Sequence, residues 1–394
     1  MRTVYVDNNA TTAVAPEVLD AMVPFLKEHY GNPSSMHLFA VEPQEAVARA
    51  REQVAHLLGA DPSEIVFTSC GSESDNAAIR SALETQPFKR HIVTTKVEHA
   101  AVLGLCKQLQ LNGCQVTFLS VDGEGRLDLK ELEEAITDQT AIVSIMYANN
   151  ETGIVNPIEE IGRIVKSKGV LFHSDAVQAV GKLPIDLAES TIDVLSMSGH
   201  KLHAPKGIGA LYIRRGTRWS PFLVGGHQEH GRRGGTENVP YIVALGRACE
   251  LAEQHLGADA PRERKMRDRL EKELLTRIPD SRVNGGWAER LPNTLSICFE
   301  FVEGEAILLL LSQSGIAASS GSACTSGSLE PSHVLRAMGV PFTYAHGSVR
   351  FSFSRYNQDD DVDYITDTLV PIIKRLREIS PFKRQVNTSA ARAK

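Results

Sequence analysis

Short apolar runs alternate with longer amphipathic stretches over the first two thirds of the chain. The runs are nearly continuous in apolar residues, which is typical of strands covered on both faces. They lie at residues 65–69, 91–95, 116–120, 142–148, 170–174, 194–198 and 209–213, with helical stretches between them at 73–84, 100–111, 129–135 and 158–168. Repeated strand–helix–strand order predicts an α/β fold around a mostly parallel sheet, to which the last run could add an antiparallel strand.

The pattern changes after about residue 237. A long helical stretch covers 239–256, and a separate charged helix follows it, PRERKMRDRLEKELLTRI. Further strands are predicted at 295–301 and 348–354, with helices at 305–314, 331–338 and 360–378. We therefore expect a large domain over 15–257, a smaller α+β domain made of 1–14 with 258–380, and a flexible tail over 381–394.

Composition narrows the class of protein. The chain has 394 residues, of which 42% are hydrophobic and 23% charged, as in an ordinary globular protein. The net charge of −6 disfavours a general nucleic-acid binder, which needs a basic surface. No apolar run approaches the ~18 residues of a membrane span, and the first residues contain no signal-peptide core. We expect a cytoplasmic protein whose six cysteines, without a CxxC pair, are free thiols.

Lys201 is the first candidate for chemistry, in the segment SMSGHKLHAPKG. It follows a predicted strand, and ligands of open α/β sheets lie beyond the carboxyl ends of the strands. A lysine there is most often a solvated loop charge. However, Ser198 and His200 beside it could donate hydrogen bonds to a phosphate, and a lysine can join an aldehyde cofactor covalently.

Asp175 closes the preceding strand in VLFHSDAVQ, with Gln178 three residues later. An aspartate at a strand end is commonly a helix N-cap. Near a cofactor-bearing lysine, it also suits the pyridinium nitrogen of pyridoxal 5'-phosphate (PLP), whose protonation makes the ring an electron sink.

Two further loops follow strands. Gly71 and Ser72 begin a helix in IVFTSCGSESDN, where free N–H groups and a hydroxyl could bind an anion, although capped turns of this kind are common. His99, in KVEHAAV, could stack on a ring or act as an acid or base; an ordinary polar loop histidine is the plainer interpretation.

Cys324 lies in the Gly- and Ser-rich segment AASSGSACTSGSLEPS, which predicts a mobile loop. A thiol displayed there is a candidate nucleophile, although a chance cysteine in a linker is the alternative. Arg350, in HGSVRFSFSR, could grip a substrate carboxylate with its planar fork. Arg355 fits a surface arginine on the polar face of the same strand.

These segments together resemble the NifS-like cysteine desulfurases, a PLP-dependent family with the aminotransferase-type fold (fold type I). The resemblance runs from residue 4 to about residue 355. It rests on the motifs VYVDNNATT, YGNPSSMH, IVFTSCGSESDN, YANNETG, HSDAVQAVGK, SMSGHKLHAPKGIG, GGHQEHGRRGGTENV, ASSGSACTSGSLEPSHVLRAMG and HGSVRFSFSR. The resemblance is highly specific, because many spaced motifs occur in order.

The resemblance implies a role for each matching residue. Lys201 binds PLP through its amine, Asp175 pairs with the ring nitrogen, Gln178 reaches the ring hydroxyl, and His99 stacks on the ring. The phosphate is held by Gly71, Ser72, Ser198 and His200, and by Thr236 of a neighbouring subunit, which implies a homodimer. Asn150 and Arg350 handle the cofactor and substrate, with Arg350 on the substrate carboxylate, and Cys324 receives the sulfur.

The implied reaction converts L-cysteine to L-alanine and leaves the sulfur as a persulfide on Cys324. A scaffold protein for iron–sulfur cluster assembly is the expected acceptor, in nitrogen fixation or in a housekeeping role. Cys324 could also bind a cluster transiently as a metal ligand. Neither a nucleic acid nor a membrane is an expected partner.

One motif departs from the family, whose phosphate turn commonly reads Gly-Ala-Thr-Glu. Here it is Cys70-Gly71-Ser72-Glu73, so the hydroxyl is kept and an extra thiol lies near the cofactor. The alternatives are a selenocysteine lyase or an aminotransferase of the same fold, a sulfur-transfer scaffold that binds acceptor proteins, and a phosphate- or nucleic-acid-binding module. The thiol segment and the net charge disfavour the aminotransferase and the binding module.

Overall fold

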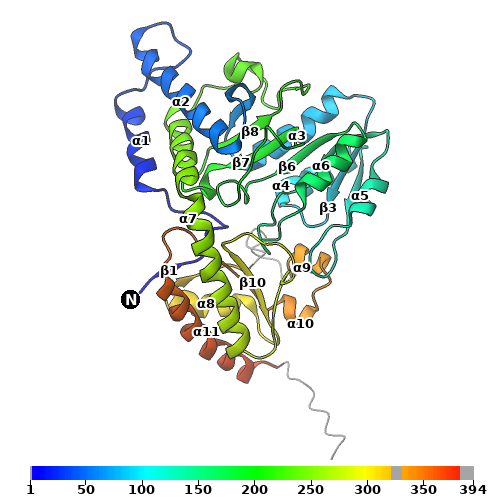
Figure 1. The fold of residues 1–394 in the computed structure, drawn as a ribbon, viewed down its shortest axis with the longest axis vertical. Helices are drawn as coiled ribbons and strands as arrows, with labels where there is room; N and C mark the ends of the chain where they lie inside the picture. Colours follow the sequence, from blue (N-terminus) through cyan, green and yellow to red (C-terminus); the bar gives the residue numbers. More distant parts are fainter. Residues whose placement is uncertain (1, 321–330, 382–394) are drawn as a thin grey trace, which may run out of the picture.

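A computed structural model describes residues 2–320 and 331–381 (Figure 1). Its largest sheet has seven strands in the order β2-β8-β7-β6-β5-β3-β4. The strands are β2 (Ile65–Thr68), β3 (His91–Thr95), β4 (Gln115–Leu119), β5 (Thr140–Ser144), β6 (Leu171–Asp175), β7 (Val194–Ser198) and β8 (Gly209–Ile213). β8 runs antiparallel to both of its neighbours, β2 and β7, and the other strand pairs of this sheet are parallel. The predicted α/β fold and its antiparallel addition are confirmed.

Helices cover both faces of this sheet. Consecutive residues of one strand show it: Ile92 packs in a core with α3 and α4, while Val93 packs in the core formed with α2 and α6 on the other face. Successive side chains of a strand point to opposite faces, so both kinds of position must be apolar. The helices are α1 (Pro16–Lys27), α2 (Val41–Leu58), α3 (Gly71–Thr85), α4 (Ala100–Leu111), α5 (Leu129–Ala135) and α6 (Ile158–Ser167).

A single helix, α7 (Val239–Arg277), runs from the large sheet into the lower part of the molecule in Figure 1. The sequence predicted two helices here, and that prediction was wrong. Pro261 lies inside α7 and lacks the N–H that a helix interior uses, at a cost of about 3 kcal/mol. The helix continues because its first half buries Leu245 in the large core and its second half buries Leu270 in another core.

That second core surrounds two small sheets. One is antiparallel, with the order β12-β10-β9, and the other pairs β1 with β11 in parallel. The elements around it are β1 (Val4–Tyr5), β9 (Ser281–Val283), β10 (Thr294–Phe299), α8 (Gly304–Gln313), β11 (Ile316–Ala317), β12 (Ser348–Ser352) and α11 (Asp359–Ile379). Two short helices, α9 (His333–Ala337) and α10 (Phe342–Ala345), pack in a separate small core. The N-terminal strand therefore lies beside residues more than three hundred positions later. The predicted domain boundaries stay a prediction.

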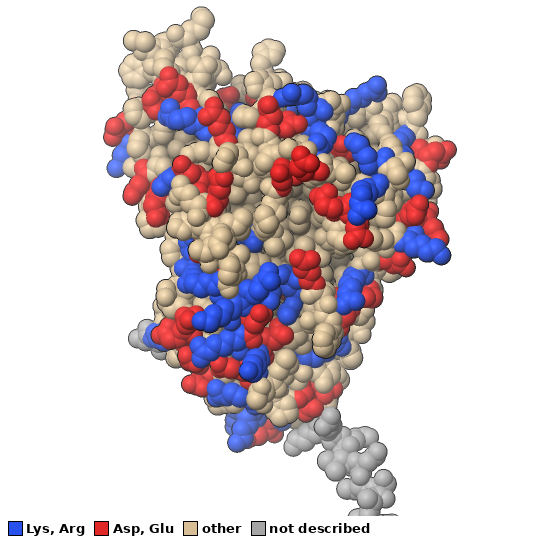
Figure 2. Space-filling view, viewed as in Figure 1, with Lys and Arg blue, Asp and Glu red and all other residues tan. Residues whose placement is uncertain are grey.

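Acidic and basic side chains are mixed on the face shown in Figure 2. Part of this mixture is explained by ion pairs between α7 and α11, such as Arg277 with Asp367 at 2.8 Å. Within the described residues, no helix combines the length and the apolar character that a membrane crossing requires.

Candidate active site

A cavity of about 260 Å³ opens at the carboxyl edge of the large sheet. Its walls come from the segments that follow β2, β3, β5, β6 and β7, where parallel strands end at one edge. The cavity brings together nine of the residues predicted from sequence: Gly71, Ser72, His99, Asn150, Asp175, Gln178, Ser198, Lys201 and Arg350.

Lys201 lies directly after β7, in the short helix η3 (Gly199–Lys201). Its Nζ donates hydrogen bonds to the backbone carbonyls of Asn9 and Ala10, both at 2.6 Å. A segment near the N-terminus thus fixes the position of the amine at the cavity. The sequence predicted the lysine but not this support.

Asp175 ends β6 and is buried, with 5% of its surface exposed. Its Oδ1 accepts the backbone N–H of Val177 at 2.9 Å and so stabilises the turn after β6. No helix of the described chain begins at this turn, so the helix N-cap considered as the alternative is not observed. Burial raises the pKa of Asp175, while the nearby His99 and Lys201 act in the opposite direction. A positive group in the cavity would stabilise the carboxylate, as a pyridinium N–H does.

A second carboxyl lies beside this one. Asp75 is 1% exposed, lines the cavity, and its Oδ1 has no hydrogen-bond partner in the described structure. Burial raises its pKa well above the usual value, and repulsion from Asp175 adds to the shift. The sheet side of the site therefore carries a buried acidic pair, which favours a cationic ring edge.

The other end of the cavity is an anion site. α3 begins at Gly71, and the side chain of its N-cap residue, Cys70, caps none of the first N–H groups. Such N–H groups and the helix dipole favour phosphate. A Cβ atom on Gly71 would lie 2.7 Å from Val177 Cγ2, so only glycine keeps this approach open. Cys70 itself lines the cavity as a half-buried thiol.

His99 is the N-cap of α4. Its Nδ1 accepts the backbone N–H of Ala101 at 3.2 Å. A nitrogen that accepts cannot carry a proton, so the proton of the neutral ring is on Nε2. The imidazole is thus held in one tautomer at the cavity wall, and the helix cap explains why it is not simply a mobile loop histidine.

Arg350, on β12, forms the opposite wall and is 2% exposed. Its guanidinium donates to Asp7 Oδ1 and to the carbonyl of Asn150, both at 2.8 Å. Its Nε has no partner within the described residues. A buried, charged donor with remaining capacity suits a carboxylate ligand.

Three predicted residues are not brought to the cavity. His200 lies half-buried beside it, with Nδ1 3.2 Å from Thr11 Oγ1, and burial lowers its pKa to about 4. Thr236 is exposed in the loop before α7, and its predicted role requires a second subunit. Cys324 lies outside the described residues. Within those residues, no group of three potential ligands could hold a metal ion, and the five described cysteines are free.

Sequence reasoning missed the N-terminal support of the site. The carbonyl of Asn9 accepts Gln178 Nε2 at 2.9 Å as well as Lys201 Nζ, and Asp7 holds Arg350. The available signal was the polar run DNN directly after the apolar VYV. The motif was noted as part of the resemblance, but no residue in it received a role.

Comparisons with known proteins agree with this geometry. The model of the family described as aminotransferase class-V matches residues 4–365. A protein of Trichormus azollae named cysteine desulfurase is 63% identical over 383 residues, covering 97% of this chain and 96% of that protein. The cysteine desulfurase NifS of Azotobacter vinelandii is 55% identical over 383 residues, covering 97% and 95%. A solved structure titled NifS-like protein is 42% identical, has a TM-score of 0.90, and covers 95% of this chain and 100% of its own.

The chain therefore belongs to the class-V aminotransferase family, in its branch of NifS-like cysteine desulfurases, whose cofactor is PLP. The residues at the cavity fit that cofactor. The uncapped N-terminus of α3 suits its phosphate, the buried acids suit its ring nitrogen, and the Lys201 amine lies at the same cavity. Both the family and the cofactor expected from the sequence are confirmed.

Proposed function

We propose that this PLP-dependent cysteine desulfurase removes sulfur from L-cysteine, releases L-alanine, and holds the sulfur as a persulfide on Cys324. The observation that supports it most is the convergence of Lys201, Asp175 and Arg350 on one cavity from three separate segments. One amine, one buried carboxylate and one guanidinium are the groups that an amino-acid substrate and a pyridine cofactor require together.

The cofactor supplies an electron-withdrawing ring that makes the substrate Cα proton acidic. Lys201 would hold it through its amine, and Asp175 would pair with its ring nitrogen and favour the protonated form. Gln178 and Asn150 would contact the ring side, His99 would stack on the ring, and Gly71, Ser72, Ser198 and His200 would hold the phosphate. Thr236 reaches the phosphate of the partner subunit in a homodimer.

The chain's own residues then position the substrate and move its protons. Arg350 binds the substrate carboxylate. The amine of Lys201, which the carbonyls of Asn9 and Ala10 position at the cavity, would take up the Cα proton and return it. His99 has its proton on Nε2, because its Nδ1 accepts the N–H of Ala101. The Nε2–H would donate to the reacting substrate.

Cys324 accepts the sulfur. Its thiolate forms a bond to the substrate sulfur, and the bond between that sulfur and the substrate Cβ breaks. The electron pair of the broken bond stays with the carbon, which takes up a proton to become the alanine methyl group. In total, L-cysteine and one enzyme thiol give L-alanine and one enzyme persulfide, so no external oxidant is needed.

We propose that the sulfur passes from Cys324 to a scaffold protein for iron–sulfur cluster assembly, for which the relatives named NifS are the support. A role in nitrogen fixation follows from the same similarity. We also propose that Cys324 binds an iron–sulfur cluster transiently. The proposed location of the enzyme is the cytoplasm.

The test is the release of alanine and sulfide from L-cysteine by purified protein with PLP and a thiol reductant. Catalytic and equal amounts of both products are expected. Cys324→Ala should keep the visible absorbance of bound PLP but lose sulfide release. The control Cys114→Ala removes a buried thiol far from the cavity lining and should remain active.

Two results would contradict this proposal. Equal turnover in Cys324→Ala would remove Cys324 from the reaction, and loss of sulfide in Cys70→Ala alone would assign the nucleophile to Cys70. Turnover of selenocysteine without turnover of cysteine would identify a selenocysteine lyase.

A further inference from the structure

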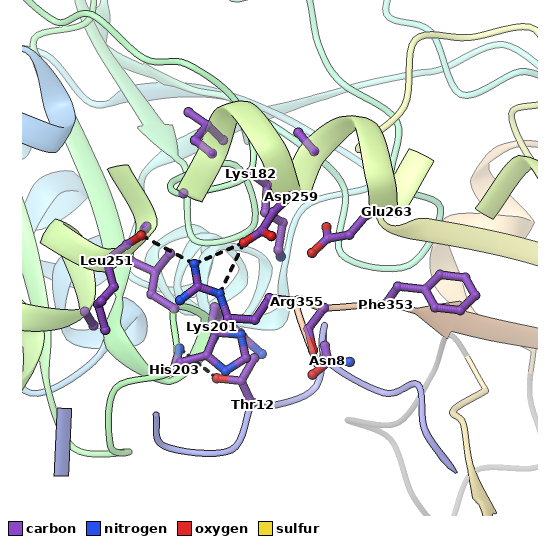
Figure 3. A pocket seen from close by; sticks show the side chains of 17 residues that line it. Asn8, Thr12, Lys182, Lys201, His203, Leu251, Asp259, Glu263, Phe353 and Arg355 are labelled. Carbon is purple, nitrogen blue, oxygen red and sulfur yellow. Dashed lines mark hydrogen bonds and ion pairs between the residues drawn. The ribbon is translucent and has the colours of Figure 1, made fainter. Parts of the chain in front are cut away.

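A second, smaller cavity lies behind Lys201, between α7, the turn after β6, and the segment after β12 (Figure 3). Its volume is about 50 Å³, against about 260 Å³ for the active-site cavity, so it is too small for a cofactor. Lys201 lines both cavities. The other ionisable residues of the small cavity are Lys182, His203, Asp259, Glu263 and Arg355.

Lys182 connects this small cavity to the active site. Its Nζ donates to Gln178 Oε1 at 2.8 Å and lies 3.4 Å from Asn9 Oδ1. Gln178 Nε2 in turn donates to the carbonyl of Asn9 at 2.9 Å, the same carbonyl that accepts the amine of Lys201. The two lysines therefore act on one short network from opposite sides.

This network fixes the orientation of the Gln178 amide. A lysine amine bound in this way donates, so the amide oxygen must face Lys182. A backbone carbonyl only accepts, so the amide nitrogen must face Asn9. One N–H of Gln178 Nε2 is used by Asn9, and the other has no partner within the described residues. Since Gln178 lines the active-site cavity, that second N–H is available to a ligand there.

The surroundings of Lys182 disfavour its charged form. Burial lowers its pKa to about 7, and repulsion from Lys201 and Arg350 acts in the same direction, while Glu263 opposes them. Glu263, on α7, is 7% exposed, and burial raises its pKa to about 8 against the attraction of Lys182. An apolar side chain would fill this position more cheaply, which indicates a function for the amine.

The other ionisable side chains of the small cavity have partners of their own. Arg355 pairs with Asp259 at 3.0 Å and is not the surface residue that the sequence predicted. The ring of His203 bonds the carbonyl of Ala13 at 2.9 Å, and burial lowers its pKa to about 4. Glu263 is therefore the carboxylate that faces Lys182.

We propose that Lys182 is a positioning residue for the cofactor: it locks the Gln178 amide so that an N–H, and not the oxygen, faces the ring hydroxyl. Glu263 lines the same small cavity and, when ionised, stabilises the charged form of Lys182. The inference rests on the proposed function, in which Gln178 contacts that hydroxyl. Without Lys182, the amide could turn over and present its oxygen, which repels an anionic ring oxygen.

The test compares Lys182→Met with the control Lys206→Met, an exposed lysine five residues beyond Lys201. Two quantities are measured: the dissociation constant of PLP, and the pH midpoint of the visible absorbance of the bound cofactor. Loss of one hydrogen bond to a charged oxygen should weaken PLP binding by roughly tenfold. The midpoint should rise by about one pH unit, because that hydrogen bond favours the anionic ring oxygen.

A double-mutant cycle separates positioning from general damage. In a Gln178→Ala background, Lys182→Met should change the dissociation constant by less than about twofold, since the amide it orients is absent. Fully additive losses would overturn the inference. The variant Lys182→Met/Glu263→Gln removes both ionisable groups, which guards against a fold defect from an unpaired Glu263, and should show the same weakened binding as Lys182→Met.

The outcomes also separate this inference from the proposed function. If wild-type protein binds PLP but Lys182→Met behaves like Lys206→Met, only the role of Lys182 is wrong. If wild-type protein binds no PLP, the proposed function falls, and the role of Lys182 falls with it.

Discussion

The two walls of the active-site cavity are built in different ways. The cofactor wall, made of Gly71, Asp175 and Lys201, lies at the ends of three buried strands of one sheet, β2, β6 and β7. The substrate wall joins chain segments that are far apart, since Asp7 and Arg350 are separated by 343 residues. We infer that the first wall binds the cofactor and moves the proton, and that the second wall determines how tightly the substrate binds.

The largest effect is expected on the cofactor wall, from Lys201→Ala. Turnover of L-cysteine should fall by about 10³-fold or more, because the amine that moves the Cα proton is lost. The absorbance of the lysine-linked cofactor should disappear, although PLP can still bind without a covalent bond. Lys206→Ala is the matched control, and a Lys201→Ala protein with normal turnover would show that the wall was assigned incorrectly.

Asp175→Asn tests the buried charge of the same wall. Asparagine still accepts the Val177 N–H, so the turn should be preserved, but it no longer stabilises a positive ring nitrogen. We expect kcat to fall by roughly 10²-fold, with PLP still bound. Exposed Asp138 provides the control Asp138→Asn. An unchanged kcat in Asp175→Asn would mean that the ring nitrogen has another partner.

Arg350→Lys tests the substrate wall. It keeps the positive charge but loses the planar fork, so KM for L-cysteine should rise by about 10- to 100-fold. The absorbance of bound PLP should not change, because the proposed role of Arg350 is to bind the substrate carboxylate. Arg282→Lys, on the outer strand of the same small sheet, is the control. If PLP binding fell while KM stayed constant, the division between the two walls would be wrong.

The last expected effect is on folding stability rather than on turnover, at Glu98, which bonds Met146 of the cavity lining. Glu98 is fully buried, accepts the backbone N–H of Met146, and burial raises its pKa to about 8. The folded carboxyl keeps its proton up to that pH, whereas the unfolded one ionises above about 4.5. Stability should therefore fall as the pH rises from about 4.5 to about 8, by up to about 5 kcal/mol.

Thermal unfolding of wild type and Glu98→Gln across this pH range checks the sign. The variant should lack this part of the slope, while Glu52→Gln, an exposed control, should follow wild type. A wild-type slope that persists in Glu98→Gln would remove Glu98 as its source.

The same comparison explains what the sequence could predict. The parallel sheet and most residues of the cofactor wall follow from local patterns, because Asp175 and Lys201 directly follow apolar strands. The roles of Asp7, Asn9 and Lys182 depend on contacts between distant segments, which no local pattern encodes. The continuity of α7 through Pro261 was missed for a related reason, since burial in two separate cores overrides a local helix breaker.

The central claim is that Lys201, and not the neighbouring Lys182, carries the cofactor. It is tested most directly by reducing the PLP-loaded enzyme with borohydride, digesting it, and locating the modified lysine by mass spectrometry. The account predicts a pyridoxyl group on Lys201 alone. Modification of Lys182, or of no lysine in a protein that binds PLP, would contradict it.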